Sequence, residues 1–223
     1  FFLAHPMTHL PPEVERQLNN VQFLLDTSGS MAEDHGSQEK GRNRRFDSAM
    51  EAIEQFTSYR QGDAFGLTIF SRHFIHWVPL TLDTQSIPLS KRFIEPDNPK
   101  LDPPGTPRRG LPDELWGITN IGKALYGVAD LLAARPTGDR MVILMTDGQN
   151  NAGKVPPMTA AEAAEALKVK IYTIGVGTRG VAPYPQTDVF GQTRYVPMEV
   201  NIDEELLGRI ADRTGGKYFR AVS

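Results

Sequence analysis

The sequence predicts an α/β protein with a doubly wound, mostly parallel six-stranded sheet that has one antiparallel edge strand. Apolar runs of strand length alternate along the chain with stretches whose apolar residues recur at helical spacing. This alternation is typical of a parallel sheet covered by helices on both faces. Right-handed crossovers between parallel strands then require the doubly wound topology.

The strands are predicted from short apolar runs that end in polar or glycine-containing segments. The six runs are residues 21–25, 64–70, 74–80, 141–145, 170–176 and 217–221. Only residues 71–73 separate the second run from the third, so we expect these two strands to form an antiparallel hairpin.

The helices are predicted from apolar residues at helical spacing, as in the stretch that contains Phe46, Ala49 and Ile53. They cover residues 45–60, 84–95, 120–134, 159–168 and a stretch that begins at Asp203. Thr159 and Glu162 have the spacing of a capping box, which predicts that the fourth helix begins there.

The remaining segments indicate how the chain is organised. We expect one domain over residues 20–223, preceded by an N-terminal segment over residues 1–19. The first three residues are apolar and are either the end of a membrane segment or a packed terminus. Six prolines make residues 96–117 a long irregular loop, and residues 178–200 have the alternation of a β-hairpin insertion.

Composition excludes several classes of function. The 24 Lys and Arg residues against 27 Asp and Glu residues give a formal net charge of −3, without the basic excess of a nucleic-acid-binding domain. The chain has no cysteine, which excludes disulfides, thiolate catalysis, zinc ribbons and iron–sulfur clusters. No apolar run reaches the roughly 18–20 residues of a membrane-spanning helix.

Polar side chains follow two of the predicted strands and precede one predicted helix. They are Asp26, Ser28, Ser30, Thr119 and Asp147. Ligands of doubly wound sheets bind beyond the carboxyl ends of the strands, where the strand order reverses. We expect the first and fourth strands to be neighbours at that point, so the sequence predicts that these side chains converge.

A set of carboxylate and hydroxyl oxygens is suited to a hard divalent cation such as Mg²⁺, which prefers oxygen ligands. Because hydroxyls are neutral, we expect this set to leave the metal incompletely neutralised. The sixth ligand is then expected to be a carboxylate from a partner protein, which favours a binding site over a hydrolytic one.

The three segments around these residues resemble the metal-ion-dependent adhesion site of von Willebrand factor type A domains. The matching motifs are Asp26-Thr-Ser28-Gly-Ser30, Thr119 before Asn-Ile-Gly, and Thr146-Asp147-Gly148. The resemblance covers about residues 20–221 and implies a Rossmann-like fold and a non-enzymatic, metal-dependent protein-binding module. It implies that Ser28, Ser30 and Thr119 ligate the metal by their hydroxyls, and that Asp26 and Asp147 ligate directly or through water. The metal is expected to be Mg²⁺, with Mn²⁺ or Ca²⁺ as alternatives.

Four other segments resemble the corresponding parts of bacterial Bat (aerotolerance-type) proteins. They are residues 171–178, 182–185, 202–207 and 214–219. This narrower resemblance implies a bacterial source, flanking membrane segments and a chaperone-like or assembly role with a MoxR-type AAA+ ATPase. It also implies a membrane-anchored domain on the periplasmic side.

Two other functions are weighed against the binding module. One is a Mg²⁺-dependent phosphotransferase-like enzyme. Such enzymes need a second Asp two residues after the first to act as acid and base, and this chain has Ser28 there. Lys123 is the lysine that is available to stabilise a phosphate. A scaffold with a vestigial site is the other, since Asp26 and Asp147 could merely cap helices.

A basic run lies close to the first of these motifs along the chain. It consists of Arg42, Arg44 and Arg45. A solvated face is the usual explanation for such a run, and guidance of an acidic partner is the alternative.

Overall fold

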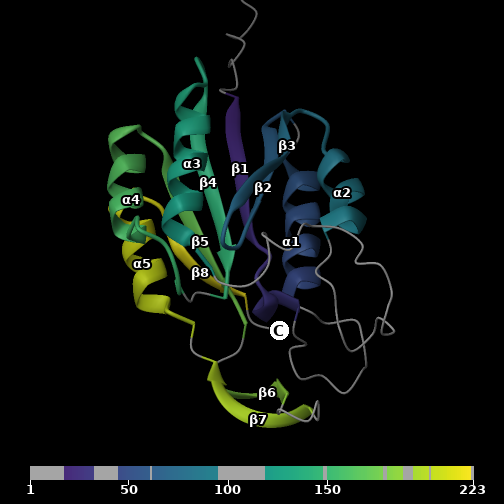
Figure 1. Cartoon of the computed structure of the whole chain (residues 1–223). Coiled ribbons are helices and arrows are strands. Elements are labelled where there is room, and N and C mark those ends of the chain that lie inside the picture. The colour runs from purple at the N-terminus through teal and green to yellow at the C-terminus, as the bar shows by residue number, and fades with distance from the viewer. Residues whose placement is uncertain are drawn as a thin grey trace, which may run out of the picture.

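A six-stranded sheet forms the centre of the protein, with the order β3-β2-β1-β4-β5-β8 (Figure 1). The computed structural model describes residues 18–32, 45–60, 62–94, 119–147, 150–177, 180–187, 193–200 and 202–221. The strands are β1 (Asn19–Asp26), β2 (Ala64–Phe70), β3 (Phe74–Thr81), β4 (Asp139–Thr146), β5 (Lys170–Val176) and β8 (Tyr218–Ala221). Within this sheet only β3 runs antiparallel to its neighbour, so the predicted fold class is confirmed.

Five helices in the described part of the chain cover the two faces of the sheet. They are α1 (Arg45–Tyr59), α2 (Ser86–Ile94), α3 (Ile121–Ala133), α4 (Pro157–Ala166) and α5 (Glu204–Arg213). Figure 1 shows α1 and α2 on one face and α3, α4 and α5 on the other. The strand order reverses between β1 and β4, which are parallel neighbours as predicted. The carboxyl ends of these two strands therefore form the switch point where ligands of such folds bind.

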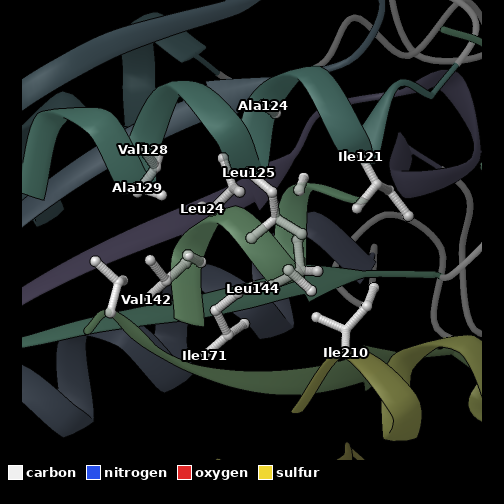
Figure 2. Close-up of a cluster of buried hydrophobic side chains, with 14 of the residues drawn as sticks. Leu24, Ile121, Ala124, Leu125, Val128, Ala129, Val142, Leu144, Ile171 and Ile210 are labelled. Carbon is white, nitrogen blue, oxygen red and sulfur yellow. The ribbon is translucent and has the colours of Figure 1, made fainter. Parts of the chain in front are cut away.

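Each face of the sheet has its own hydrophobic core because successive side chains of a strand point in opposite directions. From β1, Phe23 packs into the core under α1, and Leu24 packs into the core under α3. Figure 2 shows Leu24 and Leu144 beneath α3, with Ile210 of α5 closing the same cluster. β1 and most of β4 are buried on both faces, which explains why Gln22 is the only polar residue in the runs over residues 21–25 and 141–145.

The start of α4 differs from the sequence prediction. The helix begins at Pro157 rather than at the predicted capping box, and its N-cap residue, Pro156, makes no side-chain capping bond. Thr159 therefore lies inside the first turn. Proline has a φ suited to this first position and no N–H that needs a partner, which explains the earlier start. The prediction for α5 is confirmed, since Asp203 caps it by accepting the Leu206 N–H at 2.9 Å.

A second, two-stranded sheet follows β5. Its strands β6 (Gly180–Thr187) and β7 (Thr193–Val200) pair antiparallel within the segment in which we expect a hairpin. In Figure 1 this pair lies beyond the carboxyl ends of the parallel strands, at the end of the sheet where β1 terminates. The predicted loop over residues 96–117 and most of the segment over residues 1–19 lie outside the described residues. None of the described helices is long and apolar enough to cross a bilayer.

Candidate metal centre

The carboxyl end of β1 carries the first part of the predicted site. Asp26 is the last residue of β1, and the short helix η1 (Gly29–Ala32) follows it. The backbone N–H of Ser28 donates to Oδ1 of Asp26 at 2.8 Å, and the Oγ atoms of Ser28 and Ser30 lie 3.1 Å apart. The structure therefore brings Asp26, Ser28 and Ser30 into one hydrogen-bonded cluster, with Asp26 and Ser28 buried.

Thr119 is held at the same end of the sheet by its backbone. Its carbonyl oxygen accepts the N–H groups of Asn151 at 3.1 Å and Ala152 at 3.2 Å, in the segment that follows β4. The N–H of Asn120 donates to the carbonyl of Ser71, directly after β2, at 2.9 Å. Thr119 is thus fixed between the carboxyl ends of the two strands that flank β1.

The residues after Thr119 fix the start of α3. The side chain of Asn120 caps the helix by accepting the Lys123 N–H at 3.1 Å, and the Ile121 N–H donates to Oδ1 of Asn150 at 2.9 Å. At Gly122 an added Cβ would collide with the carbonyl oxygen of Val155. In the Asn-Ile-Gly sequence, the asparagine and the glycine therefore fix the start of the helix that directly follows Thr119.

Asp147 follows β4 and forms an ion pair with Arg45. The sequence analysis interpreted Arg45 as part of a solvated face or as a guide for an acidic partner. Nη1 of Arg45 lies 3.0 Å from Oδ2 of Asp147, and the side chains are only 2% and 5% exposed. The solvated-face interpretation is therefore wrong for Arg45, while Arg42 and Arg44 lie outside the described residues. A signal for this burial was present, because Arg45, Ala49 and Ile53 are spaced by four residues and fall on the buried face of α1.

The pKa of Asp26 is raised by its burial and by the second carboxylate of the site. Complete burial and the nearby charge of Asp147 raise the pKa of Asp26 to about 7, although hydrogen bonds from Thr146 and Ser28 oppose the shift. Since burial penalises the charged form, an ionised Asp26 is poorly compensated in the protein alone. A divalent cation placed between the carboxylates would relieve this cost.

The donor set fits a hard cation. All predicted ligand atoms are oxygens, from two carboxylates and three hydroxyls. Within the described ranges no group of three or more His, Asp or Glu side chains could hold a metal, so a cation here would depend on the hydroxyls as well. Asp26, Ser28 and Ser30 would hold such an ion from β1 and η1, and Thr119 and Asp147 from the two adjoining segments.

Sequence comparison gives two family matches, and both describe a von Willebrand factor type A domain. One match covers residues 21–149 and the other residues 110–222. Together they include every predicted ligand. In these comparisons the chain is similar to an uncharacterized protein of Borreliella burgdorferi (26% identical, 90% of this chain and 53% of that protein). It is also similar to a UPF0353 protein of Mycolicibacterium gilvum (29% identical, 91% and 55%), so it spans about half the length of these curated relatives.

Solved structures share the fold. An aerotolerance-related membrane protein from Bacteroides fragilis superimposes with a TM-score of 0.68 at 23% identity, covering 92% of both chains. BatB from Bacteroides thetaiotaomicron gives a TM-score of 0.63 at 24% identity, covering 91% of this chain and 90% of the other. Proximal thread matrix protein 1 from the mussel byssus, solved with a zinc-occupied MIDAS motif, gives 0.58 at 21% identity, covering 93% and 44%.

Proposed function

The chain belongs to the von Willebrand factor type A domain family and shares its fold with BatB, and on this premise we propose that it is a divalent-metal-dependent protein-binding module. The metal would be held by Asp26, Ser28, Ser30, Thr119 and Asp147. Its remaining coordination position would take a Glu or Asp side chain of the partner. Metal binding would therefore be the condition for partner binding.

The observation that carries this proposal is the cluster at the end of β1. The hydroxyls of Ser28 and Ser30 lie within hydrogen-bond distance of each other, and Ser28 also holds Asp26 through its backbone. Asp147 stands close enough to disfavour the charge on Asp26. Converging oxygens with partly uncompensated negative charge are what a hard cation needs.

Mg²⁺ is the proposed ion, with Mn²⁺ and Ca²⁺ as alternatives, because the ligand set is made only of oxygens. The zinc-occupied MIDAS motif of the mussel protein supports a divalent ion at this place in the fold. When bound, the ion would act as a Lewis acid that accepts one carboxylate oxygen from the partner.

We further propose that the module works in a membrane-associated bacterial assembly or chaperone-like complex with a MoxR-type ATPase, on the periplasmic side. The support is the resemblance to Bat proteins and the fold shared with an aerotolerance-related membrane protein. Flanking segments outside this chain would supply the membrane anchor. Affinity purification from the native bacterium tests this proposal, with Mg²⁺ in one half of the sample and EDTA in the other. Retention of a MoxR-type ATPase system only in the presence of Mg²⁺ would support the proposed complex.

We propose no catalytic role for the site. A phosphotransferase-like mechanism would need an acid/base carboxylate where Ser28 stands, and Lys123 directs its Nζ to within 3.1 Å of Nδ1 of His73. Turnover of a generic phosphomonoester in the presence of Mg²⁺ would overturn this view. A vestigial scaffold would be favoured instead if no divalent ion bound at millimolar concentration.

The direct test is calorimetric titration of the purified chain with Mg²⁺. We expect saturable binding that is lost when Ser28 and Ser30 are both replaced by alanine. Ser58→Ala is the matched control, because this serine is exposed on α1 and its hydroxyl donates only to the Gln55 carbonyl at 2.7 Å. Equal Mg²⁺ binding by the wild type and the double variant would exclude the proposed ligand set.

A further inference from the structure

Arg45 lies between two segments of the proposed metal centre. Besides its ion pair with Asp147, its Nη1 donates to the backbone carbonyl of Ser30 at 3.3 Å. Gly177, directly after β5, is so close that an added Cβ would lie 3.2 Å from Nε of Arg45. One guanidinium therefore ties the loop after β1 to the loop after β4, in a position enclosed by the backbone that follows β5.

The burial of Arg45 needs an explanation beyond packing. The side chain is 2% exposed, and within the described residues its Nε has no hydrogen-bond partner. An arginine that is desolvated in this way is costly unless a negative charge compensates it. Here the compensating group is Asp147, one of the proposed metal ligands.

The formal charges of the site give the Arg45–Asp147 ion pair a role in the metal-bound protein. Asp26 and Asp147 carry two formal negative charges when both are ionised, and one divalent cation balances them. The serine and threonine hydroxyls add no charge. With these ligands alone the loaded site would be neutral and would have little electrostatic attraction for an acid. The excess positive charge that the sequence analysis expects at the metal therefore needs another source.

We propose that Arg45 is a positioning residue that acts as the internal counter-cation of the metal centre. It holds Asp147 by a direct ion pair in the metal-free protein and keeps that pair when the ion is bound. The loaded site then retains one net positive charge, which selects an anionic carboxylate over a neutral oxygen as the partner's ligand. This inference rests on the proposed function of the same site.

The proposal requires opposite effects in the two states. In the metal-free protein Arg45 offsets the charge of Asp147 and stabilises the fold. In the loaded protein it repels the cation, so metal affinity is lower than the oxygen ligands alone would give. Removal of a purely structural arginine would lower both stability and metal affinity. Removal of a counter-cation would lower stability and raise metal affinity.

The test compares Mg²⁺ titrations of the wild type, Arg45→Met and Arg45→Lys at neutral pH and low salt. We expect Arg45→Met to bind Mg²⁺ about tenfold more tightly, because a neighbouring positive charge is removed. It should also unfold at a lower temperature in EDTA. Arg45→Lys, which keeps the charge, should bind Mg²⁺ nearly as the wild type does. Arg60→Met is the control, because Nε of Arg60 lies 2.8 Å from Oδ2 of the buried Asp63 and this ion pair is remote from the metal site. The Mg²⁺ affinity of this variant should not change.

Unchanged or weaker Mg²⁺ binding by folded Arg45→Met would overturn the inference while leaving the proposed function intact. Absence of Mg²⁺ binding in the wild type would instead overturn both. If Arg45→Met does not fold, the side-chain N–H resonance of Arg45 in the wild type decides the question. Protection of this N–H from solvent exchange both in EDTA and at saturating Mg²⁺ supports a retained ion pair, and loss of protection on adding Mg²⁺ overturns it.

Discussion

The hydroxyl of Thr146 donates a 2.6 Å hydrogen bond to Oδ2 of Asp26 across the pair formed by β1 and β4. Both residues end their strands and are fully buried. The bond joins the two strands whose carboxyl ends form the switch point. It orients Asp26, whose other oxygen accepts the Ser28 N–H, so the carboxylate is positioned before any ion arrives.

Asp26→Asn is expected to stabilise the metal-free protein and abolish its response to Mg²⁺. The amide keeps the shape of the side chain, with its oxygen accepting from Ser28 and its nitrogen donating to Thr146, and it removes a poorly compensated buried charge. At pH 8 in EDTA we expect a gain of about 1–3 kcal/mol in the free energy of unfolding. Thermal unfolding with and without Mg²⁺ measures both effects, and a variant that is less stable than the wild type in EDTA would contradict the first.

Thr119→Val is expected to weaken Mg²⁺ binding at least tenfold with little effect on folding. Valine has nearly the shape of threonine, and the bonds that hold this position use the backbone carbonyl rather than the hydroxyl. Calorimetry measures the affinity. Thr57→Val is the matched control, because it removes a buried hydroxyl that donates to the Glu54 carbonyl on α1, far along the chain from the proposed ligands. Undiminished affinity in Thr119→Val would remove Thr119 from the ligand set.

The fold was predictable from the sequence because its central strands, β1, β2 and β4, are largely buried on both faces. Thr68 is the only polar residue in the run over residues 64–70, and the structure has β2 over the same residues. The edge hairpin was predictable because residues 71–73 are too few for a crossover. Helix ends were less certain, as α4 shows, because a capping box and a proline at the first turn compete as start signals.

The candidate site was predictable only where a motif names its residues. Asp26, Ser28 and Ser30 fall together because a strand end fixes them within a few residues. The partner of Asp147 was missed because Arg45 follows other arginines in a polar segment, and composition there favours a solvated face. Its pairing depends on tertiary contacts between α1 and the end of β4, more than 100 residues apart in sequence.

Gly122→Ala is expected to destabilise the protein by about 1–3 kcal/mol and to weaken Mg²⁺ binding, because an added Cβ would force α3 away from the Val155 carbonyl and move Thr119 with it. Gly208→Ala is the contrasting control. Gly208 lies in α5 with no atom within 4 Å of an added Cβ, so alanine there should stabilise by about 0.5–1 kcal/mol. Urea denaturation separates the two, and equal effects would show that the close approach at Gly122 is not limiting.

Asp63 should govern part of the acid dependence of stability. Burial alone would raise its pKa, but hydrogen bonds from Arg60 and Asn19, both at 2.8 Å, outweigh burial and hold the pKa below its ordinary value. A carboxyl whose pKa is lower in the folded state stabilises the protein above the pKa of the unfolded chain, and this contribution is lost as the pH falls through the folded pKa. We therefore expect Asp63→Asn to lower the free energy of unfolding by about 1–3 kcal/mol at pH 7.

The same variant should approach the wild type in stability as the pH falls through the folded pKa of Asp63, which lies below the ordinary value of 3.8. Urea denaturation at pH 7 and at a pH well below the ordinary pKa of an aspartate measures the difference at each end. A deficit of equal size at both pH values would mean that the carboxamide disturbs packing and that the charge of Asp63 contributes nothing. A deficit confined to pH 7 would show that the ionised carboxylate, held by Arg60 and Asn19, is what stabilises the amino-terminal edge of β1 and β2.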